Sequence, residues 1–446
     1  MQSEFNQALL NLLAELVESS AQPRLVVALS GGVDSVVLLR LLVQFQRDYP
    51  HYQVLAHNVN HGLSPHAEQW ADFCEVYCAS LNVKLLRSIV NIQKTSRNSL
   101  EALAREARYQ CFSQHLQADD ILLTGHHQDD QLETLLLALK RGSGSTGLQG
   151  IRAIQPFHNG HLVRPLLNFS RKQIIDYAET AGLKWVEDES NQDTDFDRNF
   201  IRHQITPLLT ERWPAIASSA SRTARLCQEQ QGLVDEVAAQ DLQQSMCVRL
   251  GTQTLSIAAL VDLSQARRNN LLRYWLKFNG LDYPSSKQLT VLWQEVALAE
   301  QGKQPCLQLA SNTIQRYQGE LYIVPVKPLI IPDSPVTWSG EPLLWVSPDK
   351  LAVDFSMVDA ALAKQHTISC CFRQHLDPKL TCLVEGRSKS RSIKKLLQES
   401  KVPTWQREQV VFIFIDGQLV QALGVWHCQP SPTRQLPKLN LSLRSI

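Results

Sequence analysis

The stretch RLVVALSGGVDSVVLLRLL, residues 24–42, decides the fold of the N-terminal part of this chain. An apolar run is followed by two glycines, Gly31 and Gly32, and then by a second apolar run. This order is typical of a β-strand, a glycine-rich turn and an α-helix. Adjacent glycines allow a tight turn, and the first N–H groups of the helix point at whatever lies there. The stretch therefore predicts a loop that holds phosphate, with a simple helix-capping turn as the alternative.

The same alternation of strand and helix continues to about residue 183. Strands are predicted at 24–29, 53–58, 84–89 and 121–125, and helices at 35–46, 65–81, 99–116 and 130–139. Such alternation predicts an α/β domain with a doubly wound parallel sheet. Ligands of these sheets bind outside the carboxyl ends of the strands, so we expect the functional residues just after each strand.

A chain of 446 residues is too long for one compact domain. After residue 212 the pattern becomes mainly helical, with a predicted hairpin of strands at 307–316 and 321–324, and prolines then cluster. We predict a domain at 1–215 that carries the phosphate loop, a mainly helical middle domain at 216–325, a proline-rich linker at 326–350 and a small, basic α+β domain at 351–446. Strands at 412–415 and 419–423 and a basic helix at 392–399 are expected in the last of these.

The charges are nearly balanced, with 44 Lys and Arg against 43 Asp and Glu, but they are unevenly distributed. The segment from Cys371 to Ile446 holds 12 basic and 5 acidic residues, and such a surface attracts polyanions. The first twenty residues hold three glutamates and no Lys or Arg, which argues against a signal peptide. No apolar run reaches transmembrane length, so no membrane partner is expected. The ten cysteines lack the spacing of a disulfide framework, which favours a cytoplasmic protein.

A polar cluster, TGHHQDDQLET at residues 124–134, follows the fourth predicted strand. If a helix begins at Asp130, the carboxylates of Asp130 and Glu133 face the same side and can hold Mg²⁺ or an ammonium group. The same spacing is that of a capping box, in which both carboxylates only bind backbone N–H groups. His126 and His127 exceed what a cap requires, so we favour a functional site, although both roles can hold together.

The segment from His57 to Leu63 follows the second predicted strand, where a base or ribose would lie. Its two histidines, His57 and His61, also suggest a metal site. No cysteine or carboxylate beside them in the sequence completes a set of zinc ligands. Loop residues bonded to the backbone are the alternative.

Three groups of cationic or amide side chains are candidates for contacts to RNA phosphates or base edges. The first lies on a predicted helix, the second follows the acidic run at 187–193, and the third lies in the basic stretch 387–397. The groups are Arg105 and Arg108; Arg198, Asn199 and Arg202; and Lys389, Arg391, Lys394 and Lys395. A solvated charged face is the alternative for each.

The loop SGGVDS at 30–35, the segment 57–63 and the Arg-x-x-Arg-Tyr pattern at 105–109 resemble the PP-loop ATP pyrophosphatases. The resemblance implies an adenine nucleotide hydrolase-like fold that uses ATP and Mg²⁺ and releases AMP and pyrophosphate. The residues it implies for ATP binding are Ser30, Gly31, Gly32, Val33, Asp34, Ser35 and His57. The catalytic residues would be Asp34, Asp130 and Glu133, with Asp130 as a ligand of Mg²⁺.

Residues 185–202, and the run 394–396 followed by 402–405, are similar to one branch of this family. The resemblance implies ligation of free L-lysine to C2 of the wobble cytidine in an isoleucine tRNA with a CAU anticodon, through an adenylated cytidine. Decoding would change from methionine to isoleucine. His126, His127 and the three groups above would bind the substrates. The resemblance leaves open whether Asp130 and Glu133 bind lysine or Mg²⁺. The sequence also leaves open whether the chain forms a homodimer.

Three other functions remain open. A tRNA thiolase needs exposed, paired cysteines, whereas Cys74, Cys78 and Cys111 are expected in the core. A non-catalytic, ATP-dependent tRNA-binding protein would have no use for the acidic and histidine cluster. An amidotransferase-like synthetase acting on a small molecule would leave the basic C-terminal segment without a purpose.

Overall fold

The computed structural model describes most of the 446 residues. The described residues are 1–16, 23–60, 62, 64–90, 100–117, 119–249, 252–300, 305–327, 329–347, 351–429, 436–437 and 439–445. They form two compact units, residues 1–233 and 234–446. In the part of the chain that is described, no helix is both long and apolar enough to cross a membrane.

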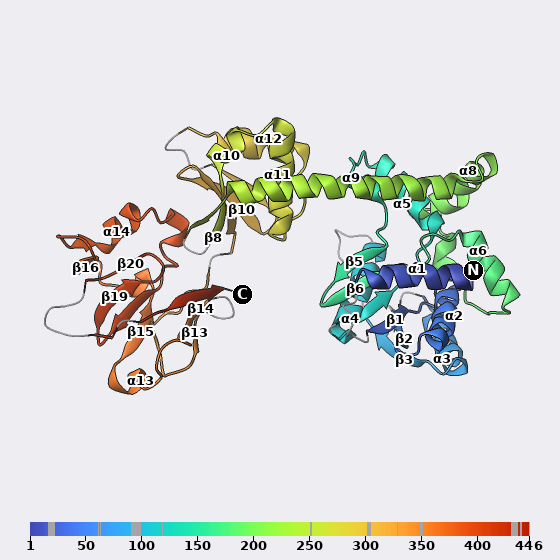
Figure 1. Cartoon of the computed structure of the whole chain (residues 1–446), viewed down its shortest axis with the longest axis horizontal. Helices are drawn as coiled ribbons and strands as arrows, with labels where there is room; N and C mark the ends of the chain where they lie inside the picture. The colour runs from blue at the N-terminus through green and yellow to red at the C-terminus, as the bar shows by residue number, and fades with distance from the viewer. Residues whose placement is uncertain are drawn as a thin grey trace. The chain divides into compact units, whose positions relative to one another are not determined.

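The first unit is built on a six-stranded sheet with the order β3-β2-β1-β4-β6-β5 (Figure 1). Its strands are β1 (Arg24–Ala28), β2 (Gln53–Asn60), β3 (Lys84–Ile89), β4 (Ile121–Leu123), β5 (Ile154–Phe157) and β6 (Gly160–Val163). All neighbours are parallel except β5 and β6. The chain passes from β1 to β2 on one side of β1, and β4 lies on the other side. This reversal confirms the doubly wound sheet and opens a crevice between the loops after β1 and β4.

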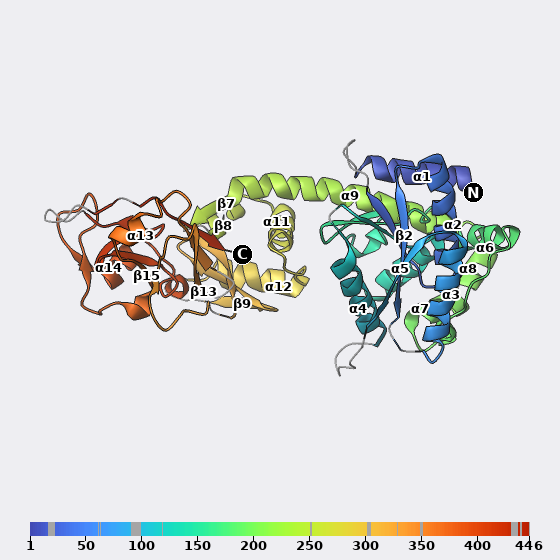
Figure 2. The ribbon, with the colours of Figure 1, turned by 90° about the horizontal axis from the view of Figure 1, so that it is seen from below.

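Helices cover both faces of this sheet, as Figure 2 shows in an edge-on view. The helices of the unit are α1 (Gln2–Ala14), α2 (Val33–Asp48), α3 (Ala67–Ser80), α4 (Leu100–His115), α5 (Gln128–Lys140), α6 (Arg171–Thr180), α7 (Asp197–Phe200), α8 (Thr206–Arg212) and the start of α9 (Ile216–Ser245). Successive side chains of a strand point to opposite faces. Val27 therefore packs with α1, α2, α3 and α6, and Val26 packs with Phe112 of α4.

Two predicted boundaries near the crevice are wrong. Strand β2 continues to Asn60, two residues past its predicted end at Asn58, because residues 57–60 pair with β3. Helix α5 begins at Gln128, two residues before the predicted Asp130. The earlier start follows from the Asp130 carboxylate, which accepts the backbone N–H of the N-cap residue His127 at 2.9 Å. His61 and Leu63 lie outside the described residues.

The middle part of the chain contains more β-structure than its helical pattern predicts. Its antiparallel sheet has the order β7-β8-β11-β10-β9 and packs against helices around the fully buried Trp275. The strands are β7 (Met246–Arg249), β8 (Thr252–Ser256), β9 (Cys306–Leu309), β10 (Asn312–Tyr317) and β11 (Glu320–Pro325), and the helices are α10 (Ile257–Val261), α11 (Gln265–Phe278) and α12 (Ser286–Val291). The predicted strand 307–316 is two strands, because the chain turns at Ala310 with φ of +49°.

The C-terminal part holds a five-stranded sheet, β12-β15-β18-β19-β20, and two smaller sheets. Its elements are β12 (Val336–Thr337), β13 (Leu343–Ser347), β14 (Leu351–Asp354), α13 (Leu362–Gln365), β15 (Ile368–Cys371), β16 (Thr381–Cys382), β17 (Arg391–Ser392), α14 (Ile393–Glu399), β18 (Phe412–Ile415), β19 (Gln418–Ala422), β20 (Trp426–His427) and β21 (Ser442–Ser445). The stretch 326–350 is not a bare linker, since β12 and β13 pair within these sheets. Trp338 and Val346 of this stretch are buried against Phe355. Prolines at the edges of sheets are compatible with this packing.

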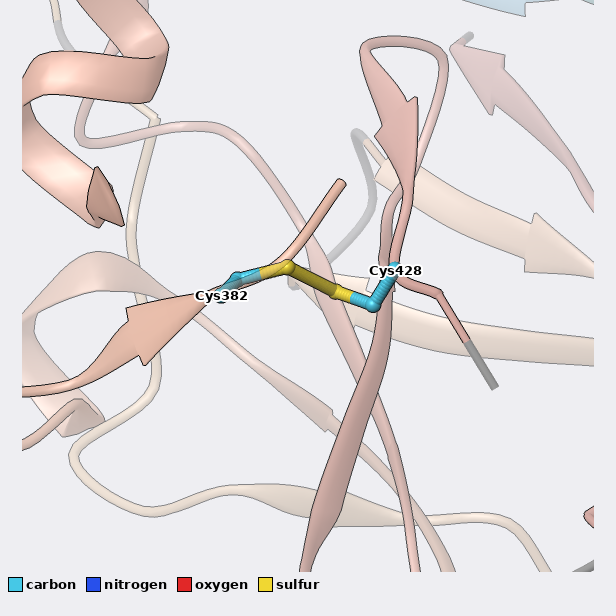
Figure 3. Close-up of a disulfide and its surroundings, with 2 residues drawn as sticks. All are labelled: Cys382 and Cys428. Atoms are coloured by element: carbon cyan, nitrogen blue, oxygen red, sulfur yellow. A yellow bond between two sulfur atoms is a disulfide. The ribbon is translucent and has the colours of Figure 1, made fainter. Parts of the chain in front are cut away.

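One pair of cysteines departs from the expectation of free thiols. Cys382 and Cys428 are joined in a disulfide, with their Cα atoms 6.2 Å apart (Figure 3). They are 46 positions apart in the sequence, and an isolated β-bridge between Val384 and Cys428 brings their segments together. Spacing along the chain could not reveal a pair created by this antiparallel contact.

Candidate active site

A pocket of about 350 Å³ opens at the carboxyl ends of β1, β2 and β4. The loop after β1 contributes Ser30, Gly32, Asp34 and Ser35, and the polar cluster after β4 contributes Thr124, Gly125, His126 and Asp130. Strand β2 contributes His57 and Asn58, and helix α4 contributes Arg108 and Tyr109. The pocket therefore unites four of the segments that the sequence singles out.

The loop of residues 30–35 has the backbone that its two glycines predict. Gly31 has φ of +91°, and a Cβ atom there would lie 2.8 Å from a methyl group of Val186. Gly32 is the N-cap of α2, so the first N–H groups of this helix face the pocket side of the loop. The hydroxyls of Ser30 and Ser35 lie 3.3 Å apart. The loop thus presents backbone donors, two hydroxyls and a helix N-terminus in one place, which suits an anion.

The acids Asp130 and Glu133 lie one helical turn apart on α5, and two arginines from 198–202 pair with both of them. Arg198 donates to Asp130 and to Glu133, each at 2.7 Å. Arg202 donates to Glu133 at 2.6 Å and to Asp130 at 3.3 Å. The Glu133 side chain is 1% exposed. We call these four residues the acid–arginine cluster. Its two negative and two positive charges give no net formal charge.

His127 is buried and joins the phosphate loop to the acid–arginine cluster. Its Nε2 atom lies 3.6 Å from Asp34 Oδ1 and 3.5 Å from Asp130 Oδ2, and its Nδ1 atom lies 3.7 Å from Asp129 Oδ2. Burial alone would lower the pKa of His127, but the three carboxylates outweigh it and raise this pKa. The ring is 1% exposed and lies between Asp34 and Asp130, whose positions it can hold, and the predicted contact of His127 with substrate remains a prediction.

The pKa values of the other polar groups follow from burial and nearby charge. Burial would raise the pKa of Asp130, but the charges of His127 and Arg198 hold it well below its usual range. Burial, together with nearby arginines, lowers the pKa of His126 to about 3, against the attraction of Asp130. Burial and His115 lower the pKa of His57 to about 4. At neutral pH, His126 and His57 are therefore neutral groups, whereas Asp130 is ionised.

The remaining predicted residues of the first unit lie around this pocket. Arg108 lines it, whereas Arg105 is exposed and stacks 4.9 Å from the ring centroid of Tyr109. Asn199 donates to the backbone oxygen of Asp193 at 2.8 Å. Arg198 and Arg202 face the acids of α5, and their predicted contacts with RNA remain predictions.

The four predicted cations of the second unit form a separate surface. Lys389, Lys394 and Lys395 are exposed and Arg391 is half-buried, near the start of helix α14. The opposite face of this helix buries Leu396 and Leu397. Trp405 packs edge-on against Tyr317 and Tyr322, so its ring serves packing between segments of this unit.

Several residues of the site were not found from the sequence. Arg171, at the start of α6, lies 3.7 Å from Asp34, and its backbone N–H donates to Asp129. Trp70 also lines the pocket. No local motif marks Arg171 or Trp70, whereas Asn191, another lining residue, lies within the acidic run 187–193 that the sequence analysis singles out.

The cysteines near the sheet do not have the properties that sulfur transfer requires. Cys74 and Cys78 are buried, and burial raises the pKa of each thiol to about 12. A nucleophilic cysteine is partly exposed and has a lowered pKa. This pair therefore belongs to the core, as the sequence predicts.

The switch-point crevice, the loop at 30–35 and the helix N-terminus behind it define an ATP-binding domain of the PP-loop class. Residues 1–209 match the family model described as PP-loop domain. Residues 255–322 match the model described as TilS substrate binding domain, and residues 368–440 match the TilS substrate C-terminal domain.

Curated relatives extend this similarity over nearly the whole chain. The tRNA(Ile)-lysidine synthase of Serratia proteamaculans is 41% identical over 417 residues, which cover 93% of each chain. That of Vibrio parahaemolyticus is 42% identical over 410 residues, which cover 90% of each chain. The chain belongs to the tRNA(Ile)-lysidine synthase family, ATP-dependent ligases that modify tRNA. Among solved structures, the U34-tRNA thiolase NcsA of Methanococcus maripaludis is 18% identical with a TM-score of 0.43, covering 51% of this chain and 78% of that one.

Proposed function

We propose that this protein joins free L-lysine to C2 of the wobble cytidine of an isoleucine tRNA with a CAU anticodon. In the first step the C2 oxygen attacks the α-phosphorus of ATP, the bond to the β-phosphate breaks, and pyrophosphate leaves. In the second step the ε-amino group of lysine attacks C2, the C2–O bond breaks, AMP leaves and the amine loses a proton. The product is lysidine. The observation that carries the proposal is that Asp130 of the acid–arginine cluster lines the same pocket as the loop at 30–35.

The loop at 30–35 would bind the phosphates of ATP. Backbone N–H groups at the start of α2 and the hydroxyls of Ser30 and Ser35 are suitable donors for this purpose. Binding by preorganised donors also stabilises the charge that develops on pyrophosphate as it leaves. Gly31 has no space for a side chain because Val186 and Cys74 pack against it, and its positive φ fixes the turn that places Ser30 and Gly32 on the pocket wall.

Mg²⁺ fits Asp34 better than Asp130. The Oδ1 atom of Asp34 accepts no hydrogen bond within 3.5 Å among the described residues, and its charged neighbour there is His127 Nε2 at 3.6 Å, so this oxygen retains capacity to accept a cation. Both oxygens of Asp130 already accept hydrogen bonds, from His127 and from the arginines. We therefore infer that Asp34 would hold Mg²⁺, and that Asp130 would join it only after Arg198 moves. The ion would supply positive charge that neutralises the phosphates.

The acid–arginine cluster would select lysine. A free amino acid carries an ammonium and a carboxylate group, and the cluster offers two carboxylates and two guanidinium groups. Arg198 and Arg202 occupy the acids in this structure, so lysine would have to take over some of their contacts. The arginines could then pair bidentately with the carboxylate of lysine or with a tRNA phosphate. The reacting amine also has to lose its charge before it attacks C2.

The second unit would bind the body of the tRNA. Its exposed cations near α14 suit contacts to phosphates, which position an RNA without reading its sequence. The wobble base, in contrast, has to leave its stack to reach ATP in the pocket. We place the protein in the cytoplasm, where tRNA, ATP and free lysine occur together. Sedimentation velocity will distinguish a monomer from a homodimer.

The direct test is incorporation of labelled lysine into isoleucine tRNA with a CAU anticodon, measured with and without ATP. Methionine tRNA, which has the same anticodon, is the control. We expect label only with ATP and only in the isoleucine tRNA. Pyrophosphate release without label would point to another nucleophile, and the absence of both signals would favour a tRNA-binding protein without this activity.

A further inference from the structure

Three metal-ligating side chains converge at the edge of the ATP pocket, where His57 lines the pocket and the other two, Cys111 and His115, take no part in the proposed reaction. His57 comes from strand β2, and Cys111 and His115 come from helix α4. One ligand atom from each of the three lies within 4.8 Å of the other two. His57 and Cys111 are buried, whereas His115 is exposed. No cysteine lies beside His57 in the sequence, but the fold brings Cys111, which is 54 positions away, close to it.

The two residues of α4 are spaced for joint coordination. Cys111 and His115 are four positions apart, so their side chains lie on one face of the helix. The Sγ atom of Cys111 is 3.9 Å from Nδ1 of His115, so the two side chains are neighbours, although the nitrogen available to a metal is Nε2. The ring centroid of His57 is 5.2 Å from that of His115. Tetrahedral zinc with bonds of about 2.0–2.3 Å needs ligand atoms roughly 3.3–3.8 Å apart. Binding would therefore require the three ligand atoms to approach one another more closely than the 4.8 Å limit within which they now lie.

The hydrogen bonds around the three side chains leave ring nitrogens free for a metal. His115 Nδ1 lies 2.8 Å from the carbonyl oxygen of Cys111 and must donate to it, which leaves Nε2 with its lone pair. His57 Nε2 lies 2.9 Å from the hydroxyl of Ser88, which can accept a proton from it and leave Nδ1 free. Histidines that bind metals commonly donate their second N–H to an oxygen in this way.

We propose that His57, Cys111 and His115 bind one zinc ion, with water at the fourth position. A thiolate and two imidazoles suit Zn²⁺ and other borderline-soft cations, whereas Mg²⁺ prefers oxygen ligands. The site is therefore distinct from the Mg²⁺ that accompanies ATP. Bound zinc would tie α4 to β2, and α4 carries Arg108 and Tyr109 on the pocket wall.

Cobalt substitution tests the proposal without measuring activity. The full-length chain, stripped with a chelator, is titrated with Co²⁺, and the thiolate-to-cobalt absorption band is recorded. We expect one equivalent of Co²⁺ to produce the band, and an equivalent of Zn²⁺ to abolish it. Cys111→Ser should lose the band, and His115→Gln should weaken binding at least about tenfold, as loss of one of three protein ligands implies. Cys306→Ser, an exposed thiol in the other unit, is the matched control and should keep both signal and affinity.

A band that persists in Cys111→Ser, or an unchanged affinity in His115→Gln, would overturn the proposal, as would the absence of any band in the wild-type chain. Circular dichroism checks that each variant is folded. If Cys111→Ser does not fold, His115→Gln still decides the question, because His115 lies on the exposed side of α4. Zinc-dependent protection of the Cys111 thiol from alkylation, located by mass spectrometry, is a second measurement and should disappear in His115→Gln.

Discussion

The two regions proposed to meet the substrates carry their charges in opposite ways. In the acid–arginine cluster, the Glu133 side chain is 1% exposed and Arg198 is 27% exposed, and each charge has a partner of opposite sign. On α14, Lys394 and Lys395 project into solvent while the apolar side of the helix faces the core. The cluster can therefore select a ligand by the fixed positions of its charged groups, whereas the exposed lysines attract the phosphates of an RNA from a distance.

The physical reason for the difference is the dielectric environment. A buried charge loses its hydration, so removing its partner leaves a large cost that solvent and salt do not screen. An exposed charge is screened over about 10 Å at 0.1 M salt, and its pair interactions are weak. Substitutions in the cluster should thus have large effects that are insensitive to salt, and substitutions on α14 should have small, salt-dependent effects.

The largest effect is expected for Glu133→Gln. The change removes one negative charge and leaves Arg198 and Arg202 sharing a single carboxylate. Breaking a buried ion pair in this way lowers the free energy of unfolding by about 3 kcal/mol or more. Lysine incorporation should fall below detection, with circular dichroism unchanged. Glu229→Gln is the matched control, because Glu229 pairs with Arg225 on the exposed surface of α9. Turnover at the wild-type rate in Glu133→Gln would refute the assignment of this residue.

The next largest effect is expected for Gly31→Ala. The added methyl group would collide with Val186, and the φ of +91° is unfavourable for any residue with a Cβ atom. ATP affinity, measured by calorimetry, should fall at least about tenfold, equivalent to roughly 1.4 kcal/mol. Gly182→Ala is the control, since Gly182 also has positive φ but has open space around it. Equal ATP affinities of the wild-type chain and Gly31→Ala would show that the loop tolerates a side chain.

The pH dependence of stability distinguishes buried groups from exposed ones. His126, with a pKa of about 3 when folded, stays neutral in the native state and is protonated in the unfolded chain below about pH 6.5. Stability is therefore fully retained above pH 6.5 and falls as the pH decreases toward 3, by up to about 1.4 kcal/mol per pH unit from this group. Urea unfolding of His126→Gln between pH 6.5 and 4.5 should show a shallower loss. Parallel pH profiles for the two proteins would contradict the neutral state of His126 in the folded chain.

The smallest effect is expected for the double variant Lys394→Ala, Lys395→Ala. Affinity for tRNA should fall a few-fold, and the slope of log affinity against log salt should decrease by up to about 1.8, since each lost phosphate contact contributes roughly 0.9. Turnover at saturating tRNA should stay the same. Lys364→Ala, an exposed cation on α13, is the control for a general loss of charge. If the double variant leaves the salt slope unchanged, α14 is not part of the tRNA surface.

Much of the first unit could be predicted because its signals are local. Strands β1 and β3 and helix α2 lie within a few residues of their predicted ranges, since apolar periodicity and glycines act over short segments. The Asp130 prediction was wrong in detail because the helix start depends on a side chain reaching back to His127. The disulfide and the paired strands within 326–350 were missed because both depend on segments distant in the sequence.

The sequence by itself determined the class of the sheet, the position of the phosphate loop and the basic character of the C-terminal part. Those features depend on composition and on short-range periodicity. Only the tertiary structure decided that Arg198 neutralises Glu133 from 65 positions away, that His127 is buried between Asp34 and Asp130, and that Cys111 lies beside His57. These contacts arise when parallel strands bring the ends of distant segments to one edge of the sheet, which no local pattern encodes.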